Sequence, residues 1–329
     1  MKLSIVILCW NDLQVIGACL RSIYAETRDL DLEVIVSDNG STDGSLEYIS
    51  HNYPGVRIVA NGVNLGFAKG NNAGMELSRG EYVLILNPDT IIHDRALEKL
   101  VAFADSRPEG GAFGCRVLNP NGSYQMSARP FPTIWRDLIG ALYLRPLAYL
   151  SDLFISDTYT GWKGDSERAV DWQSGCCIMF RGNVLKSLGG FDEQFFYHFE
   201  EVDLCRRVWN AGYPVLYTPA AVITHLGGQS VNRFPIRFEL EKYRGRYRYY
   251  YKYYGTKGAQ RCRHVVLTWI RVRQVVWGLS GVFALSPTIK GRLEMYRVVA
   301  QWNRRLDSVR FVENSEEPEP VKKIVVQPS

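Results

Sequence analysis

The stretch Glu81-Tyr-Val-Leu-Ile-Leu-Asn-Pro-Asp89 decides the fold of this chain. Residues 82–86 are a continuous apolar run, which is typical of a central strand covered on both faces. Because proline cannot continue a central ladder, the strand is predicted to end before Pro88. Asp89 then lies at the carboxyl edge of a buried sheet, where open α/β folds bind ligands. Its carboxylate suits a hard divalent cation that in turn holds a diphosphate, and it equally suits the cap of a helix starting at Thr90.

Strands and helices alternate through the first 110 residues around this stretch. Strands are predicted at residues 3–9, 32–37, 56–60 and 82–86. Helices are predicted between them, the first ending at Leu20, the second near residues 46–49 and the third where the stretch 61–74 runs into a helix. This order predicts an α/β fold with a doubly wound, mostly parallel sheet and right-handed crossovers.

The pattern changes beyond the fourth strand. A strand at residues 112–118 is followed by a hairpin turn, Asn119-Pro-Asn-Gly122. The segment 130–159 is rich in Leu, Tyr, Trp and Pro, and it is interpreted as short amphipathic helices. The remaining predicted elements are a strand at 170–180, a short helix ending at Leu188-Gly-Gly190, a helix from Glu200 to Gly212, and strands at 214–217 and 221–225.

Composition places the chain among ordinary globular proteins. It has 329 residues, 46% of them hydrophobic, and a formal net charge of +5. Its seven cysteines form no Cys-x-x-Cys pair, so we expect reduced thiols in a cytosolic setting, without a disulfide frame or a zinc site. The sequence opens on a predicted strand without a basic n-region, so no signal peptide is expected. No uncharged run reaches the roughly 18–20 residues that a spanning helix needs.

The turn after the first strand argues against several nucleotide-binding classes. Cys9-Trp-Asn-Asp12 contains no glycine, so the dinucleotide fingerprint, the P-loop and the basic glycine-rich loop of nucleotidyltransferases are missing. The polar groups that remain at strand ends are Asp38, Asn64, Asn71, Asn72 and Asp89. Asp38 can accept a hydrogen bond from a pyrimidine N–H, and the two adjacent asparagines can bond a ribose or a base edge. Each residue also suits a turn or a cap, but five at successive strand ends predict a binding edge.

These residues lie in longer motifs that resemble the donor half of the family 2 glycosyltransferases. The motifs are Val34-Ile-Val-Ser-Asp-Asn-Gly-Ser-Thr-Asp43, Asn64-Leu-Gly-Phe-Ala68 with Asn71-Asn72, Leu86-Asn-Pro-Asp89, Gly189-Gly-Phe-Asp-Glu-Gln-Phe-Phe196 and Glu200-Glu-Val-Asp-Leu-Cys205. They run in the family's order between Lys2 and Gly228, and they are most similar to those of bacterial rhamnosyltransferases of cell-surface polysaccharide synthesis. The resemblance implies a GT-A fold, a nucleotide-sugar donor, a divalent cation (Mg²⁺ or Mn²⁺) and inversion at the anomeric carbon.

The resemblance also assigns roles on the donor side. Asp38 would hold the pyrimidine base, and Asn71 and Asn72 would lie along the nucleoside. Asp89 matches the last aspartate of the family's Asp-x-Asp metal motif, in which Asn87 here replaces the first carboxylate. Asn11 and Asn64 complete the expected donor-binding set.

On the other side of the sugar, Glu201 matches the general base, at a position where many relatives have aspartate. His225 matches a histidine that completes the metal site in some relatives. Asp203 is the expected catalytic helper, and the acceptor is expected at Trp172, Ser174 and Glu200. Inverting transfer needs such a division, with a base on one face of the sugar and a cation on the other. Taken without the resemblance, the three acids would suit the first turn of any helix.

Beyond Gly228 the chain becomes basic and aromatic. Arg244, Arg246 and Arg248 interleave with tyrosines between Tyr243 and Tyr254. This segment has three interpretations: docking on an anionic membrane, binding of single-stranded nucleic acid, or helices packed together with a solvated basic face. A lipid-linked acceptor, which must be met at the membrane surface, favours the first.

We therefore expect a catalytic domain at residues 1–228, a helical extension at 229–312 and a disordered tail at 313–329. The predicted activity is transfer of a sugar, with L-rhamnose from its thymidine diphosphate donor as the best match, to a lipid-linked saccharide. The expected location is cytoplasmic, peripheral on the inner face of the cell membrane. A non-catalytic nucleotide-sugar or polysaccharide-binding protein on the same fold and a nucleic-acid-binding protein are the alternatives.

Overall fold

The computed structural model describes residues 1–155, 157–227, 235–281 and 287–305. The chain forms two compact units, one of Met1–Phe131 with Thr158–Phe234 and one of Pro132–Asp157 with Pro235–Ser329. Residues 132–157, which the sequence analysis placed in the catalytic domain, thus belong to the second unit. The predicted boundary at residue 228 and the predicted disordered tail from residue 313 lie outside the described residues.

The first unit contains a mixed sheet whose first half is parallel, as predicted. β1 (Leu3–Cys9), β2 (Leu32–Asp38), β3 (Arg57–Ala60) and β4 (Tyr82–Leu86) lie in the order β3-β2-β1-β4. β1 pairs in parallel with both β2 and β4, so the carboxyl ends of these strands meet at one edge. β4 is buried along its whole length, as its apolar run predicts.

The second half of the sheet reverses direction at β11 (Cys177–Arg181), which is antiparallel to both β4 and β6 (Ala112–Leu118). β12 (Val215–His225) is parallel to β6 and antiparallel to β5 (Thr90–Ile92), which completes the order β4-β11-β6-β12-β5. After β6 the chain turns through the predicted hairpin into β7 (Tyr124–Gln125) and later returns as β11. The predicted α/β fold is confirmed, with an antiparallel insertion that the sequence analysis did not predict.

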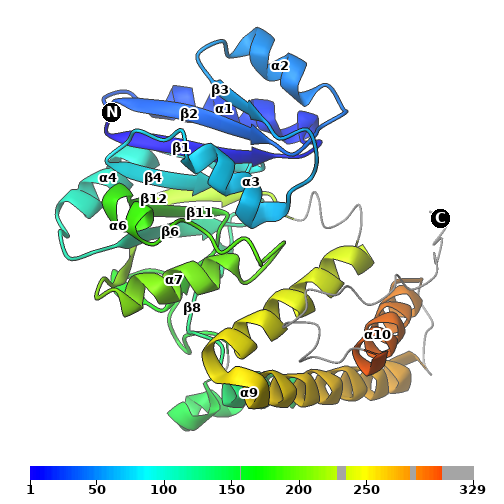
Figure 1. Cartoon of the computed structure of the whole chain (residues 1–329). Helices are drawn as coiled ribbons and strands as arrows, with labels where there is room; N and C mark the ends of the chain where they lie inside the picture. Colours follow the sequence, from blue (N-terminus) through cyan, green and yellow to red (C-terminus); the bar gives the residue numbers. More distant parts are fainter. Residues whose placement is uncertain (156, 228–234, 282–286, 306–329) are drawn as a thin grey trace. The chain divides into compact units, whose positions relative to one another are not determined.

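Helices cover both faces of the sheet (Figure 1). α1 (Leu13–Glu26), α2 (Ser45–Asn52) and α4 (Ala96–Asp105) contribute to one buried apolar cluster. α3 (Gly66–Met75), α6 (Gly182–Ser187) and α7 (Glu200–Asn210) contribute to a second cluster. β1 alternates between them, with Ile5 and Ile7 in the first and Val6 in the second, because successive strand side chains point to opposite faces. Strands that are apolar on both faces need these two helical layers to bury them.

The single strand predicted at residues 170–180 is wrong. The segment forms β9 (Arg168–Val170), β10 (Trp172–Gln173) and β11. Asp171 interrupts the run, because its carboxylate accepts the Phe131 N–H at 2.6 Å and its own N–H donates to Tyr159 Oη at 2.8 Å. β10 pairs with β8 (Ala128–Arg129) in a separate two-stranded sheet.

Two further local predictions differ from the structure. The strands predicted at 214–217 and 221–225 are one strand, β12, whose register on β6 shifts between Thr218 and Val222. The helix that Asp89 was expected to cap is absent from this part of the chain, because residues 90–92 form β5 and α4 begins only at Ala96. The capping interpretation of Asp89 is therefore excluded.

The second unit is helical. α5 (Ile134–Ala141) and α10 (Pro287–Arg305) both pack against α9 (Pro235–Gly281), which is kinked at Gly255, where φ is 65° and ψ is −169°. The short helices η1 (Arg145–Tyr149) and η2 (Asp152–Phe154) follow α5, as predicted for this segment. Among the described residues, no helix combines the length and the apolar character needed to cross a membrane.

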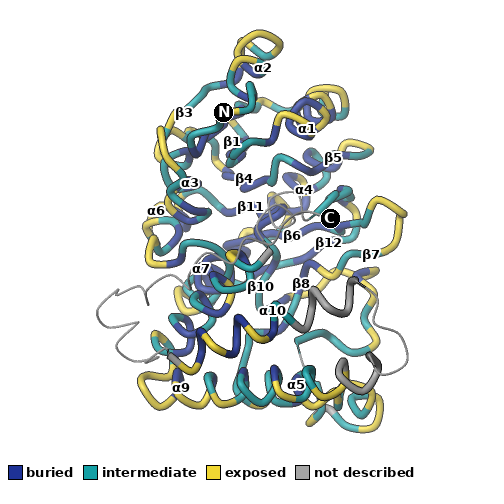
Figure 2. Tube along the Cα trace, turned by 90° about the vertical axis from the view of Figure 1, so that its right-hand side faces the viewer, coloured by how far each residue is buried: buried dark blue, intermediate teal, exposed yellow. Residues whose placement is uncertain are grey.

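Most residues of the tyrosine–arginine segment of α9 are buried or half-buried; Figure 2 colours the trace by this burial. Tyr247 and Tyr250 are fully buried. Arg246 forms an ion pair with Asp137 of α5 at 3.1 Å, and Tyr250 Oη donates to the same carboxylate at 2.6 Å. Arg244 forms an ion pair with Glu241 one turn away. The packed-helix interpretation describes this segment, because Arg244 and Arg246 serve contacts inside the unit.

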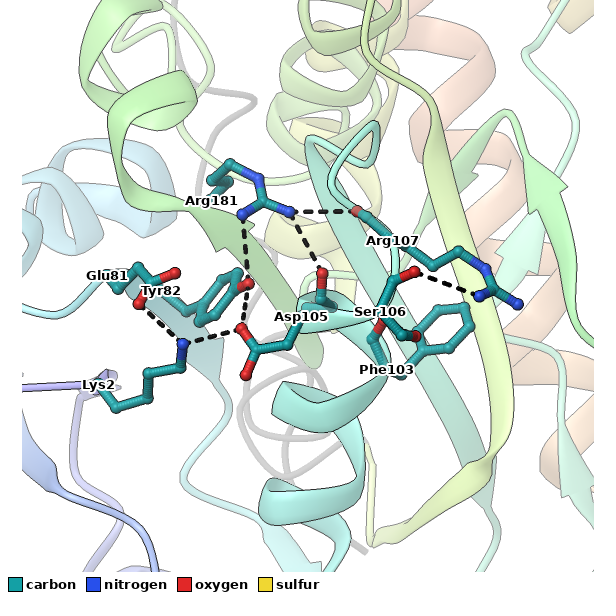
Figure 3. Close-up of polar contacts among 9 residues, drawn as sticks. Lys2, Glu81, Tyr82, Phe103, Asp105, Ser106, Arg107 and Arg181 are labelled. Carbon is teal, nitrogen blue, oxygen red and sulfur yellow. Dashed lines mark hydrogen bonds and ion pairs between the residues drawn. The ribbon is translucent and has the colours of Figure 1, made fainter.

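A polar cluster joins the amino edge of β4 to the end of α4 (Figure 3). Arg181, at the end of β11, donates to Tyr82 Oη at 3.2 Å, and Tyr82 Oη donates to Asp105 at 2.8 Å. The Arg181 guanidinium also donates to the carbonyl oxygens of Ala104, Arg107 and Gly110. Arg181 thus supplies a donor to the Gly110 carbonyl and a second donor to the carbonyls of Ala104 and Arg107, which also accept the N–H groups of Arg107 at 3.2 Å and Gly110 at 3.0 Å.

Arg181→Leu is therefore expected to lower the free energy of unfolding by about 1–3 kcal/mol, because it takes the Arg181 donor from the buried Gly110 carbonyl and removes the hydrogen bonds to Tyr82, Ala104 and Arg107. Lys2→Ala is the matched control: Lys2 Nζ lies 2.8 Å from Glu81 and Asp105, whose side chains are 51% and 45% exposed. Such exposed pairs contribute less than about 1 kcal/mol. Urea unfolding of both variants checks this, and an equal loss in the two would contradict it.

Candidate active site

Asp38 is the last residue of β2, and only one of its two carboxylate oxygens has a hydrogen-bond partner among the described residues. Its Oδ2 accepts the N–H groups of Gly40 at 2.9 Å and Ser41 at 3.0 Å. Its Oδ1 is buried and has no partner among the described residues. The turn needs Gly40, because φ is +75° there and an added Cβ would lie 2.9 Å from the Gly62 carbonyl oxygen. A fixed acceptor with one unpaired buried oxygen suits a ligand N–H.

Asn71 and Asn72 are adjacent on α3 and differ in function. Asn71 is buried, its Nδ2 donates to the Phe67 carbonyl at 2.9 Å, and its Oδ1 has no partner among the described residues. Asn72 is bound to the Phe191 main chain through both its Nδ2 and its Oδ1, each at 2.9 Å. The structure therefore leaves an open acceptor at Asn71 and uses Asn72 to hold the segment that leads to α7.

Asn11 and Asn64 hold the two turns that flank Asp38. Asn11 adopts a left-handed conformation, φ 58°, and its Oδ1 accepts the Thr42 N–H at 2.7 Å. Asn64 Oδ1 accepts the Gly66 N–H at 2.9 Å. Both side chains shape the binding edge, as is usual for asparagine in turns.

Asp89 and His225 meet because of the register between β5 and β12, which places His225 opposite Thr90. His225 Nε2 lies 3.2 Å from Asp89 Oδ1 and 3.3 Å from Asn87 Nδ2. Two donor atoms that share one cation lie about 3 Å apart, so the pair fits neighbouring ligand positions. In the described ranges no three His, Cys, Asp or Glu side chains form a ligand cluster.

Gln125, in β7, fixes the His225 ring. Its Nε2 donates to Asn119 Oδ1 at 2.9 Å and to the His225 carbonyl oxygen at 3.3 Å. Its Oε1 therefore faces the ring, 2.7 Å from His225 Nδ1. Because an amide oxygen only accepts hydrogen bonds, Nδ1 carries the proton, and the lone pair of the neutral ring lies on Nε2, beside Asp89.

Neutral His225 is therefore expected to be the Nδ1–H tautomer. Long-range proton–nitrogen correlation spectra of the imidazoles report this directly, without any cation. Gln125→Leu removes the acceptor and should bring the Nε2–H tautomer into the spectrum, whereas Gln125→Glu keeps an acceptor and should retain Nδ1–H. Observation of the Nε2–H tautomer in the unaltered protein would overturn the assignment.

Glu200 and Glu201 begin α7 behind a strained turn. His198 and Phe199 both adopt left-handed conformations, with φ of 67° and 75°. Such conformations cost of order 1–3 kcal/mol each for non-glycine residues, and they cluster at functional sites. Glu200 and Glu201 are 3% and 9% exposed, and the Oε2 atom of each has no partner among the described residues.

The two carboxyl groups have different proton affinities. Burial raises the pKa of Glu201 to about 7. Burial and then the charge of Glu201 raise the pKa of Glu200 well above its ordinary range. Both shifts favour the protonated carboxyl group, and at a pKa of about 7 Glu201 is balanced between its two forms at neutral pH. A general base works best with a pKa near the operating pH, so Glu201 fits this role.

Tyr197 connects this pair to Asp89. Burial, followed by the charges of Glu200, Glu201 and Asp89, raises the pKa of the Tyr197 phenol above its ordinary range. The three carboxyl groups therefore lie close enough to act electrostatically on one phenol. The main chain also joins them, because the Asn87 N–H donates to the Cys176 carbonyl at 3.0 Å. The structure thus brings the predicted base and the predicted metal ligand into one site.

The other predicted site residues have structural partners. Asp203 is fully buried, and its Oδ2 lies 2.8 Å from Arg207 Nε. Arg207 also donates to the carbonyl oxygens of Leu188 and Gly190. Trp172 Nε1 donates to the Pro130 carbonyl at 3.0 Å, and Ser174 Oγ accepts the Cys176 N–H at 3.4 Å. Asp203 therefore positions Arg207, which holds α7 to the preceding turn, and this ion pair argues against a role of Asp203 as base.

Sequence reasoning missed Gln125, Arg129 and Tyr197. Gln125 meets His225 across 100 residues of sequence, and the positive charge of Arg129 favours ionised Glu201 from the separate β8 strand. Neither residue lies in a motif, so no local signal identifies it. Tyr197 lies between two of the quoted motifs, and that position is the one signal that would have found it.

Comparisons with known proteins agree with this geometry. Residues 4–163 match the family described as glycosyl transferase family 2. An N-acetylglucosaminyl-diphospho-decaprenol L-rhamnosyltransferase of Mycobacterium tuberculosis (strain CDC 1551 / Oshkosh) is 32% identical over 220 residues, which cover 62% of this chain and 69% of that protein. The rhamnosyltransferase WbbL of Escherichia coli (strain K12) is 26% identical over 206 residues, which cover 60% of this chain and 74% of that protein.

The fold has solved counterparts. The mannosyltransferase PcManGT of Pyrobaculum calidifontis, in complex with GDP-Man and Mn²⁺, matches with a TM-score of 0.55 at 16% identity, and the match covers 96% of this chain and 88% of that one. At this identity the likeness shows the fold alone, which is that of the GT-A glycosyltransferases. The predicted family and fold are confirmed: the chain belongs to glycosyl transferase family 2 and is a glycosyltransferase.

Proposed function

We propose that this glycosyltransferase moves L-rhamnose from a thymidine diphosphate donor to a lipid-linked saccharide, in the synthesis of a cell-surface polysaccharide. The observation that carries the proposal is the meeting of Glu201, Asp89 and His225 in one site at the carboxyl edge of the sheet. Two relatives named as rhamnosyltransferases support the choice of sugar. The decaprenol diphosphate in one of those names supports a lipid carrier, and hence work at the inner face of the cell membrane.

On the acceptor side, Glu201 takes the proton of the attacking hydroxyl. The hydroxyl oxygen bonds to the anomeric carbon as the bond to the donor diphosphate breaks on the opposite face, so the configuration inverts. Burial and the charge of Glu201 raise the pKa of Glu200, which favours the neutral form of Glu200 beside the ionised base. A buried base excludes water, and this favours transfer over hydrolysis of the donor.

On the donor side, the open oxygens of Asp38 and Asn71 bind the nucleoside. Asp89 and the Nε2 atom of His225 would hold a divalent cation, Mg²⁺ or Mn²⁺. When bound, such a cation supplies positive charge against the departing diphosphate. The residues present fit it, because an aspartate and a correctly oriented imidazole already lie together, with Asn87 beside them.

The direct test is transfer of labelled sugar to a prenyl-diphosphate-linked N-acetylglucosamine, with thymidine diphosphate rhamnose as donor and uridine and guanosine diphosphate sugars as competitors. Rhamnose transfer that depends on added Mg²⁺ or Mn²⁺ supports the proposal. Efficient transfer from a different donor sugar, with none from the rhamnose donor, would replace rhamnose while leaving the glycosyltransferase assignment in place.

Asp38→Asn should weaken binding of thymidine and uridine diphosphates about 10- to 100-fold. The remaining amide oxygen can still accept the Gly40 and Ser41 N–H groups, so the turn is kept, while an NH₂ group replaces the open acceptor. A lost hydrogen bond to a charged group costs about 1.5–3 kcal/mol, which gives that range. Titration calorimetry measures the effect, and an unchanged affinity at an unchanged melting temperature would rule out the role of Asp38.

A further inference from the structure

The second unit contains a long stretch without acidic residues. Between Glu241 and Glu294 the sequence has twelve Lys and Arg residues and no Asp or Glu: the twelve are at positions 242, 244, 246, 248, 252, 257, 261, 263, 271, 273, 290 and 292. Some of these charges serve the fold, because Arg246 pairs with Asp137 and Arg263 donates to the Asn303 carbonyl oxygen. The question is which of the others face outward, and what they meet there.

One stripe of α9 carries several of the outward charges. Lys257, Arg261, His264 and Arg271 are all exposed. Their spacings of four, three and seven residues place them on one face of the helix beyond the Gly255 kink. Within the described part of the chain, Lys257, Arg261 and Arg271 form no ion pair. The same face ends at Val275, which is 61% exposed, beside Val276, which is 46% exposed.

Exposed apolar side chains are concentrated in this unit. Of the fifteen exposed large hydrophobic residues in the described ranges, nine lie in the second unit and six in the first, although the first unit has more than twice as many described residues. The highest exposures are 80% at Tyr149 and 83% at Leu150, both near η1. A merely solvated basic helix would not need this apolar surface.

We propose that the outer face of α9, with the Lys257–Arg261–Arg271 stripe and the valines at its end, docks the enzyme on an anionic lipid bilayer. A basic face next to exposed apolar side chains is the pattern of helices that lie in the membrane interface. The absence of acids over the stretch removes repulsion from anionic headgroups. The inference rests on the proposed function, because a lipid-linked acceptor has to be reached at that surface, and it replaces Arg244 and Arg246, which serve internal contacts, with residues that face outward.

The test is co-sedimentation of the full chain with phosphatidylglycerol–phosphatidylcholine vesicles at moderate salt. Reversal of Lys257, Arg261 and Arg271 to Glu should lower the partition coefficient at least ~100-fold. The matched control reverses Arg28, Lys163 and Lys186, three exposed residues of the first unit, with the same change in net charge. The control should bind like the unaltered protein, and equal losses in the two triple variants would overturn the α9 face as the docking site.

The apolar contribution is separated by salt. The double variant Val275→Ser with Val276→Ser should bind roughly tenfold more weakly at high salt, where the charges are screened. Equal binding of the unaltered protein to pure phosphatidylcholine vesicles would exclude an anionic requirement. Loss of binding to a single-stranded oligonucleotide, with vesicle binding unchanged, would assign the stripe to nucleic acid and contradict the proposal.

Activity distinguishes this inference from the proposed function. With a short, water-soluble acceptor, the α9 triple variant should turn over at the rate of the unaltered protein. With the acceptor embedded in anionic vesicles, it should be slower in proportion to its lost binding. If the unaltered protein transfers no sugar to either acceptor, the proposed function fails, while vesicle binding still decides the docking face.

Discussion

Glu201→Gln is expected to lower the turnover number by a factor of about 10²–10⁴, the usual loss when a general base is removed. Glutamine keeps the size of the side chain, and the unpaired Oε2 of Glu201 makes no bond whose loss would disturb the fold. Donor affinity measured by calorimetry should stay near that of the unaltered protein, because Asp38, Asn71 and Asp89 are unchanged. The effect should thus appear in kcat far more than in binding.

The same substitution is expected to stabilise the protein at alkaline pH. Burial raises the pKa of Glu201 from an ordinary value of 4.5 to about 7, so the folded chain binds this proton more tightly than the unfolded chain. Between these two values, rising pH therefore removes stability, and above pH 7 the whole cost of about 3 kcal/mol is present. Glutamine carries no such cost, so the variant should gain stability over the unaltered protein as the pH rises from 4.5 to 8.

Glu200→Gln is the matched control. Burial and the charge of Glu201 raise the pKa of Glu200 and so favour its neutral form, which glutamine resembles, and this variant should keep most of its activity. Turnover of the unaltered enzyme should fall below pH 7 as Glu201 gains its proton. If Glu201→Gln retains near-parental turnover while Asp203→Asn is inactive, the base is Asp203, despite its ion pair with Arg207.

The first half of the fold could be predicted because its signals are local. Each apolar run from β1 to β4 ends at a polar turn, and a parallel sheet with helices between its strands is the arrangement that such an order permits. The antiparallel entry of β11 depends on an excursion of nearly sixty residues between Leu118 and Cys177. The strands that pair with β11 are determined by how the whole chain buries its apolar residues. No periodic pattern in a single sequence reports this.

The candidate site follows the same division. Asp38 and Asp89 were found because each ends an apolar run, and Glu201 was found through its motif. The sequence could not show which of Glu200, Glu201 and Asp203 is held in an ion pair. Arg207, the partner of Asp203, lies one helical turn further along α7, and the other hydrogen-bond partners of Arg207 lie in a preceding loop. The sequence also could not show that Gln125 bonds to the His225 ring, because only the β6–β7 hairpin brings Gln125 to that ring.

Asp89→Asn is expected to abolish detectable transfer, and to weaken Mn²⁺ binding in the presence of nucleotide diphosphate by at least ~10²-fold. Removal of residues that merely support a ligand already costs about 10- to 100-fold in metal affinity, so the loss of a ligand carboxylate should cost more. The substitution leaves the hydrogen bond from the Leu226 N–H to the main-chain carbonyl of residue 89, at 2.9 Å, so the local fold should persist. Manganese titration followed by electron paramagnetic resonance measures the affinity, and full activity of the unaltered enzyme in excess chelator would refute the cation requirement.

The control is a substitution that should strengthen Mn²⁺ binding, because a general loss of structure could not produce that result. Asn87→Asp restores the first carboxylate of the Asp-x-Asp pattern at a position where Asn87 Nδ2 now lies 3.3 Å from His225 Nε2. A second carboxylate beside Asp89 strengthens attraction to a divalent cation, so Mn²⁺ should bind more tightly than it does to the unaltered protein. The two carboxylates also repel each other when no cation is present, so the melting temperature should fall without Mn²⁺ and rise with it. If Asn87→Asp binds Mn²⁺ more weakly than the unaltered protein, as Asp89→Asn is expected to do, the cation binds elsewhere.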